Sequence, residues 1–304
     1  MRMRPLALSE RLDAEPTVSL AGLLTGGSSP LGGDTPLVLE DYVREILSSG
    51  FPGFRGQAGR ALAMQLEGYL THVVDRDFAE LGHEVRNPVA LRRWMTAYAA
   101  ATATTASLET IRKAALGDTG PPPAKTTVLP YRDALQRLWI VDPLPGWLPT
   151  NNRLRRLGQQ PKHHLADPAL AAHLLGVSAD ALLSASDARP RIPRDGTLLG
   201  ALFESLVTQS VRVYAQAADA RVYHLRTKGG EREVDLIVEA PNGRILALEV
   251  KLAKTVGDHD VRSLLWLRDA LGDDLIDAAV ITTGPGAYRR QDGIAVIPAA
   301  LLGP

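Results

Sequence analysis

The pattern of hydrophobic positions changes period near residue 220. Residues 196–218, GTLLGALFESLVTQSVRVYAQAA, carry apolar side chains at helical spacing. Short apolar runs typical of strands follow, namely RVYHLRT, EVDLIVEA, RILALEVKLA, AAVITTG and IAVIPAALL, with a helical pattern, DVRSLLWLRDAL, between the third and the fourth. Asn242-Gly243 predicts a two-residue hairpin turn between the second and third strands. This order predicts an α/β domain with a mixed sheet.

The first two thirds of the chain show mainly helical periodicity. Residues 1–36 are rich in Gly, Ser and Pro and predict a loop or linker, and residues 37–82 predict helices. Helices are also predicted over 88–101, from an N-cap at Ser107, and over 124–139, before a short strand in WIVDPLPGW. Helix, turn, helix and strand in this order are typical of a winged helix-turn-helix. We therefore divide the 304 residues into three domains, 1–82, 83–190 and 191–304, which gives an α/β (α+β overall) protein.

Charged residues interrupt two of the predicted strands. Asp235 lies within the apolar run EVDLIVEA, and Glu249 and Lys251 lie within RILALEVKLA. Because side chains alternate along a strand, Glu249 and Lys251 project side by side, and the hairpin brings Asp235 onto the neighbouring strand. Unpaired ions in buried strands cost several kcal/mol or more, so something must offset their charge.

One solution to this charge problem is a metal ion. Two carboxylates with a backbone carbonyl form the oxygen-rich site that Mg²⁺ prefers, and such an ion activates water and stabilises a phosphate in its transition state. Glu204, on the helix that precedes the strands, is placed to reach the same point. The competing interpretation is a structural ion-pair network without chemistry.

The order helix-Glu, strand-Asp, strand-Glu-x-Lys resembles the PD-(D/E)XK restriction-endonuclease-like superfamily, with Val234 in place of the proline. The resemblance implies catalytic roles for Glu204, Asp235, Glu249 and Lys251. Asp235 and Glu249 would bind the metal, and Lys251 would support the attacking water.

A wider resemblance covers nearly the whole chain. GALFESLV, LRTKGGEREVDLIVE and LEVK, together with YLTHVVDRDFAEL and HHLADPALAAHLLG, resemble the C-terminal domain of unknown function in a family of bacterial and archaeal AAA-type ATPases. The resemblance implies that residues 1–82 include a remnant of the ATPase core. The phosphate-binding pattern G-x-x-x-x-G-K-[ST] does not occur, so we expect no ATP site in this chain, which is a shortened product, a misplaced start or a remnant.

Composition excludes several other classes. Acids and bases balance at 34 each, cysteine is absent, and no apolar run is long enough for a membrane span. These features exclude a disulfide framework and a thiolate metal site, and favour a cytoplasmic protein without a membrane partner.

Locally, residues 86–162 carry 12 Lys and Arg against 4 Asp and Glu, an excess that suits a nucleic-acid backbone. The candidate recognition helix of the winged-helix region would present Lys125, Thr126, Thr127, Tyr131 and Arg132 to DNA. The alternative is a scaffold that packs against neighbours.

Two functions stay open at this point. The first is nucleic-acid binding, most naturally of DNA, with or without Mg²⁺-dependent cleavage. The second is an inactive nuclease-like module that binds another protein, a full-length ATPase homologue or a second copy of itself.

Overall fold

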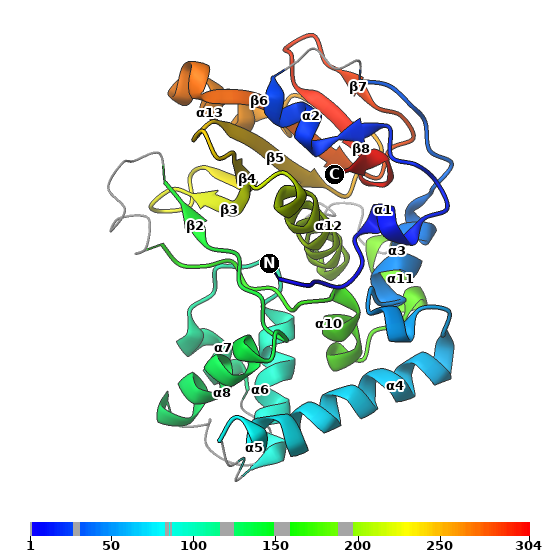
Figure 1. The fold of residues 1–304 in the computed structure, drawn as a ribbon, viewed down its shortest axis with the longest axis vertical. Helices are drawn as coiled ribbons and strands as arrows, with labels where there is room; N and C mark the ends of the chain where they lie inside the picture. Colours follow the sequence, from blue (N-terminus) through cyan, green and yellow to red (C-terminus); the bar gives the residue numbers. More distant parts are fainter. Residues whose placement is uncertain are drawn as a thin grey trace.

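The computed structural model describes residues 2–26, 31–82, 85, 87–115, 125–148, 159–187 and 197–304, and within these not the side chains of 125–127 and 185–187. A seven-stranded mixed sheet occupies one end of the molecule, and most of the helices occupy the other end (Figure 1). The strand order is β2-β3-β4-β5-β6-β8-β7. These strands are β2 (Gly146–Trp147), β3 (Arg221–Arg226), β4 (Glu233–Glu239), β5 (Ile245–Lys251), β6 (Leu275–Thr282), β7 (Tyr288–Arg289) and β8 (Ala295–Pro298).

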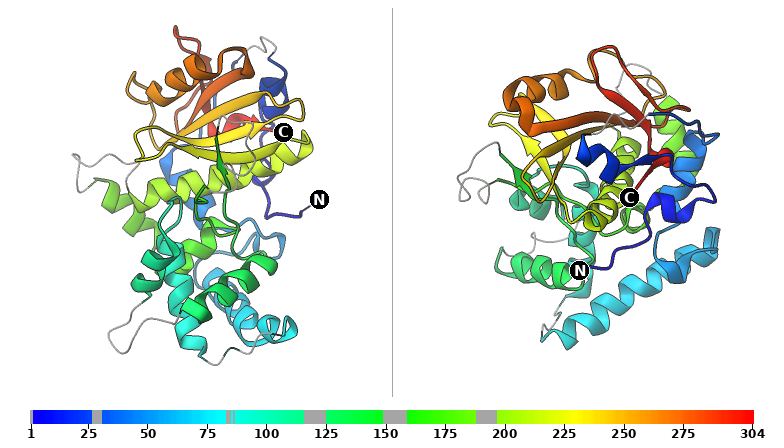
Figure 2. Two further views of the ribbon diagram at one scale, coloured as in Figure 1. Left: turned by 90° about the vertical axis from the view of Figure 1, so that its left-hand side faces the viewer. Right: turned by 45° about the horizontal axis from the view of Figure 1, so that its top comes forward.

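Two long helices cover the sheet on opposite faces. Helix α12 (Leu198–Ala217) packs on β3, β4 and β5, and begins at Thr197, whose Oγ1 accepts a hydrogen bond from the Gly200 amide. Helix α13 (Arg262–Leu271) packs on β4, β5 and β6. Figure 2 shows α12 running between the sheet and the helical part. Alternate residues of β5 belong to the two hydrophobic cores, as the period of two predicts.

The predicted hairpin between β4 and β5 is present, but its loop is one residue longer than expected. The Ala240 amide donates to the Arg244 carbonyl, and the Gly243 amide donates to the Ala240 carbonyl. Gly243 has φ +83°, the left-handed conformation that closes a three-residue hairpin loop. The two-residue turn was therefore wrong, and the antiparallel pairing was right.

The N-terminal segment is part of the sheet end of the molecule. It forms α1 (Leu8–Arg11), β1 (Val18–Ser19) and α2 (Leu20–Thr25), where a loop or linker was predicted. Strand β1 pairs in parallel with β9 (Leu302–Gly303), and the Leu8 amide donates to Ser210 Oγ on α12. The glycines and prolines that suggested a linker connect short elements whose leucines are buried.

The remaining helices form a compact group against α12 (Figure 1). They are α3 (Leu39–Leu47), α4 (Gly59–His72), α5 (Phe78–Glu80), α6 (Pro88–Ala100), α7 (Leu108–Ala114), α8 (Lys125–Arg137), α10 (Pro168–Leu175) and α11 (Ala179–Asp187). Between α4 and α5 the π-helical turn Val73–Asp77 continues the helix. Ser107 caps α7 as predicted, since its Oγ accepts from the Thr110 amide.

The winged-helix prediction is not confirmed. In the described part of residues 83–190 the strand that follows α8 is β2, and it pairs with β3 of the large sheet. The segment before β2 forms only isolated antiparallel bridges within the described part of this region, Val141 with Leu165 and Leu144 with Lys162, and not the paired strands of a wing. The described residues also contain no helix that is both long and apolar enough to cross a membrane.

Candidate functional site

The start of β4 and the end of β5 meet at one edge of the sheet. The antiparallel register pairs Leu236 of β4 with Leu248 of β5. Asp235 and Glu249 each lie one residue beyond that pair, on the two neighbouring strands. A cavity of about 310 Å³ at this point is lined by all four residues of the predicted catalytic set: Glu204, Asp235, Glu249 and Lys251. These four residues, which are spread over positions 204 to 251, thus line one cavity. Arg226 and Glu233 line it as well.

A buried lysine that the sequence reading did not single out also belongs to this site. The Nζ of Lys162 lies 2.8 Å from Glu204 Oε1, 2.9 Å from Asp235 Oδ1 and 3.0 Å from Glu233 Oε1. The side chain is 1% exposed. The contacts with Glu204 and Asp235 are hydrogen bonds, and Glu233 adds an ion pair. Lys162 was counted within the basic excess of residues 86–162, but its charge is used inside the protein.

The backbone positions Lys162 through an isolated bridge. Its amide and carbonyl both bond to Leu144, at 2.9 and 2.8 Å, in the segment that leads to β2. Lys162 therefore reaches the site from the segment that bridges to Leu144, whereas Glu204 reaches it from α12.

The carboxylates of the site titrate differently because their partners differ. Burial raises the pKa of Glu204 to about 8, and the charge of Asp235 adds to this effect. Burial would also raise the pKa of Asp235, but Lys162 and the Val250 amide, which donates to Oδ2 at 3.0 Å, bring that pKa below its usual value. Burial and Asp235 raise the pKa of Glu249 well above its usual value.

Glu249 is the least satisfied acid of the site. Its Oε1 lies 3.2 Å from Lys251 Nζ, whereas its Oε2 is buried and has no hydrogen-bond partner in the described residues. A buried acceptor without a partner costs about 1–3 kcal/mol, and this acceptor lies in a residue that lines the cavity.

These residues fit a Mg²⁺ ion that is held by few protein ligands. Within the described residues no group of three or more His, Asp or Glu side chains is arranged to hold a metal. Lys162 engages one oxygen each of Glu204, Glu233 and Asp235, so these carboxylates turn toward its ammonium. Mg²⁺ in enzymes is commonly bound by one or two carboxylates plus water and substrate phosphates, and Asp235 and Glu249 can supply those two.

The predicted nucleic-acid contacts on α8 do not form one exposed surface. Tyr131 is buried, and its ring packs edge-on against Phe78 with centroids 6.1 Å apart. Arg132 pairs with Asp133 at 2.8 Å. The side chains of Lys125, Thr126 and Thr127 lie outside the described residues. A buried tyrosine offers no stacking surface, so contacts through α8 stay a prediction that Tyr131 does not support.

Three buried histidines surround Lys162 and its segment. His163 bonds to the Tyr98 hydroxyl and the Ala106 carbonyl, and His164 Nδ1 lies 3.3 Å from Ser205 Oγ. His224 Nε2 lies 2.9 Å from the Gln160 carbonyl. Burial lowers the pKa of all three, to about 4 for His224. They are therefore neutral at neutral pH.

Comparison with known proteins places the candidate site in a recognised domain. Residues 199–302, which include all four predicted catalytic residues, match the domain of unknown function DUF4143. The C-terminal part of the chain is therefore similar to this domain family. Residues 39–181 match a second domain of unknown function, DUF8612, which ends after the Lys162 segment. Lys162 therefore joins the two matched regions at the site.

The curated relatives extend beyond this chain. The uncharacterized proteins Mb2031c of Mycobacterium bovis and Rv2008c of Mycobacterium tuberculosis are each 28% identical over 249 residues. The match covers 82% of this chain and 50% of each relative, so the chain spans about half the length of the relatives it matches. No solved structure matches the chain.

Proposed function

We propose that the DUF4143 domain binds nucleic acid and cleaves its phosphodiester bonds with the help of one Mg²⁺. The observation that carries the proposal is the convergence of Glu204, Asp235, Glu249 and Lys251 on one cavity. The charges support it further. The cavity residues and Lys162 bring four carboxylates against two lysines and Arg226. A divalent cation would counteract the burial that raises the pKa of Glu204 and Glu249, and so would favour the ionised form of both carboxylates.

Each residue has a distinct role in the proposed reaction. Asp235 and Glu249 would hold the ion, which supplies Lewis-acid stabilisation of the charge that develops on the phosphate oxygens. Lys251 would donate a hydrogen bond to the attacking water. Glu204 would assist by holding Lys162, which in turn fixes Asp235 at 2.9 Å.

One observation favours the second candidate function, an inactive module that binds another protein. Lys162 already satisfies Glu204 and Asp235, so the site can persist as a structural ion cluster without any metal. Under this hypothesis the partner is another protein, such as a full-length ATPase of the family that the sequence resembles, or a second copy of the chain.

Cation binding separates the two candidates. We would titrate Mn²⁺ and Mg²⁺ into the whole protein by calorimetry, with and without a single-stranded oligonucleotide, and assay cleavage of single- and double-stranded DNA. Glu249→Gln removes one proposed ligand and keeps the side-chain shape. Glu233→Gln is the matched control, because Glu233 lies at the rim with its side chain 33% exposed and is not a proposed ligand.

The proposal expects cation binding and cleavage in the wild type, at least tenfold weaker binding in Glu249→Gln, and near wild-type binding in Glu233→Gln. Lys251→Met should keep cation binding and lose most of the cleavage. Absence of both cation binding and cleavage in the wild type, even with the oligonucleotide present, would overturn the proposal and leave the interaction module.

A further inference from the structure

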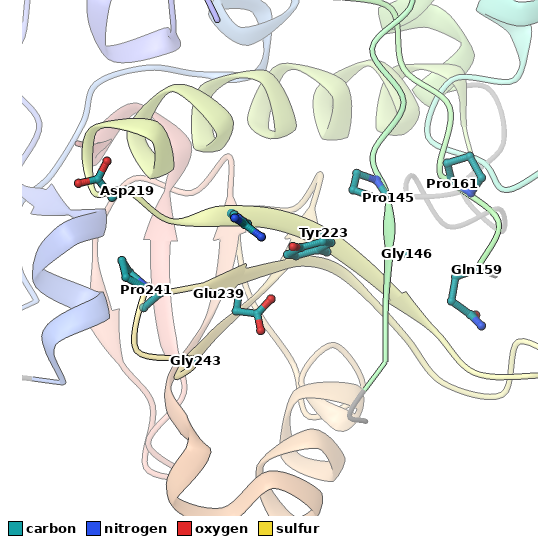
Figure 3. A pocket seen from close by; sticks show the side chains of 11 residues that line it. Pro145, Gly146, Gln159, Pro161, Asp219, Tyr223, Glu239, Pro241 and Gly243 are labelled. Carbon is teal, nitrogen blue, oxygen red and sulfur yellow. The ribbon is translucent and has the colours of Figure 1, made fainter. Parts of the chain in front are cut away.

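A second, larger cleft lies at the opposite end of β3 from the candidate site. Two adjoining cavities, of about 930 and 750 Å³, share Pro145, Asp219, Arg221 and Tyr223 in their walls. Figure 3 shows the larger one, between the end of α12, strand β3 and the segment at Gly146. Arg221 begins β3 and Arg226, which lines the candidate site, ends it, so the two sites lie about 16 Å apart along the strand.

The smaller cavity has an arginine-rich wall. Asp142 is buried and faces three guanidinium groups, with nitrogens of Arg2, Arg4 and Arg212 at 2.6, 3.3 and 3.1 Å from its carboxylate. Arg212 also donates to the Asp142 and Pro143 carbonyls. One carboxylate cannot neutralise three arginines. Burial lowers the pKa of Arg212 to about 10, an effect that Asp142 opposes and that Arg4 and Arg2 reinforce.

Two arginines, Arg4 and Arg221, line the smaller cavity with guanidinium N–H groups that are available to a ligand. Arg4 lines the smaller cavity, and within the described residues its terminal guanidinium nitrogens form no hydrogen bond. Arg221 lines both cavities, is exposed, and forms no hydrogen bond or ion pair with a described side chain. Its cross-strand neighbour Glu239 lines the larger cavity. A free guanidinium fork is the group that best matches the oxygens of a phosphate.

The larger cavity offers a ring surface and polar acceptors. Tyr223 lies two residues after Arg221 on β3, so the two side chains point to the same side of the strand. Figure 3 shows the Tyr223 ring in the wall of the cavity, with Glu239 nearby and Gln159 on the facing segment. A half-buried tyrosine ring can stack on a base, and a carboxylate accepts hydrogen bonds from hydroxyl or amino groups.

We infer that this cleft is a nucleotide-binding site, with the phosphate held by Arg4 and Arg221 and the base stacked on Tyr223. Glu239 accepts hydrogen bonds from the sugar or the base. The volume suits one nucleotide, since small-ligand pockets commonly measure about 300–1,000 Å³. The nucleotide is either free or one unit of a nucleic-acid strand, because both carry the same phosphate and base. The inference does not depend on cleavage at the DUF4143 site.

Binding of three probes to the whole protein tests this inference. We would titrate AMP, inorganic pyrophosphate and an oligothymidylate without added divalent cation, so that the candidate metal site does not contribute. Arg4→Gln, Arg221→Gln and Tyr223→Leu are compared with Arg262→Gln. The control removes the same charge from an exposed arginine at the start of α13 that lines neither cavity. Circular dichroism verifies that each variant is folded.

We expect AMP to bind the wild type and the Arg262→Gln control equally, and each of the other three variants at least tenfold more weakly. Competition between the oligonucleotide and AMP would identify a nucleic-acid strand as the source, whereas AMP binding without competition would identify a free nucleotide. Pyrophosphate that binds as tightly as AMP would overturn the assignment of a base site. No binding of any probe, or unchanged binding in Arg4→Gln and Arg221→Gln, would overturn the inference as a whole.

Discussion

At the scale of single residues, Lys162 decides the charge of the candidate site. Its pKa is raised well above the usual value, because Asp235, Glu204 and Glu233 outweigh the effect of burial. Asp235 and Glu249 can be found from the sequence, because each is an acidic residue within an apolar run that predicts a strand. Lys162 lies outside any regular element, 42 residues before Glu204 and 73 before Asp235, so no spacing rule connects it to them. In the sequence Lys162 is followed by two histidines and shows no periodic pattern.

Replacing Lys162 by methionine should destabilise the protein strongly. The buried carboxylates of Asp235 and Glu204 would lose their counter-ion, and breaking a buried ion pair costs about 3–5 kcal/mol. Equilibrium urea unfolding at pH 7.5 measures the free energy of unfolding. Lys254→Met, which removes an exposed lysine, should change it by less than about 0.5 kcal/mol. Adding Glu204→Gln to Lys162→Met should recover part of the loss, and an equal effect at positions 162 and 254 would contradict the buried cluster.

His224 should make the protein sensitive to mild acid. Its pKa falls to about 4 on folding because the ring is buried, whereas the unfolded chain binds the proton near pH 6.5. The unfolded state therefore gains protons first, and stability declines as the pH falls from about 6.5 toward 4. His224→Gln keeps a donor for the Gln160 carbonyl and does not titrate. Between pH 7.5 and 4.5 we expect this variant to lose about 2–3 kcal/mol less unfolding free energy than the wild type.

The matched control for that comparison is His259→Gln, whose side chain is 80% exposed in the wild type. It should follow the wild-type dependence on pH, because this side chain is not buried on folding. A His224→Gln variant that loses stability in parallel with the wild type would show that other groups cause the acid sensitivity.

At the scale of elements, strong periodicity decided what could be predicted. Helices α6, α12 and α13 and strands β3 to β6 and β8 appear where the pattern placed them, since each has a clear period and turn residues at its ends. Strands β1, β2, β7 and β9 have two residues each, too few to show any alternation. They form because a longer partner or the core already fixes the neighbouring backbone. Helix α2 was missed because only six residues separate its cap from Gly26.

Helix α2 should contribute to stability like a core element, although its sequence context resembles a linker. Leu20 has no exposed surface and belongs to the core beneath α12. Leu20→Ala should therefore lower the free energy of unfolding by about 2–5 kcal/mol in urea titrations. Leu129→Ala, at a site 48% exposed on α8, is the control and should cost much less. Equal small losses at both positions would mean that residues 2–26 behave as a tail.

At the scale of the whole molecule, one hydrophobic core runs through parts that the sequence divides. It contains Leu20 of the N-terminal segment, Trp94 of α6 and Leu248 of β5. Lys162 adds a polar connection between the regions matched by the two domain families. Composition describes only short stretches of the sequence, whereas this core joins residues more than 200 positions apart. Domain boundaries predicted from composition therefore cannot take such contacts into account.

This continuity predicts a single unfolding transition. Trp94 is fully buried in the helical part, while Trp266 lies on α13 and packs against the core on the other face of the sheet. In each of two variants that keep only one of these tryptophans, the urea midpoint from fluorescence should match the midpoint from far-UV circular dichroism of the same variant. If the helical part and the sheet were separate domains, the two probes would disagree within a variant, and a change such as Leu91→Ala in α6 would shift only the Trp94 midpoint. Because Leu91 and Leu248 share one core, Leu91→Ala should instead move both midpoints together.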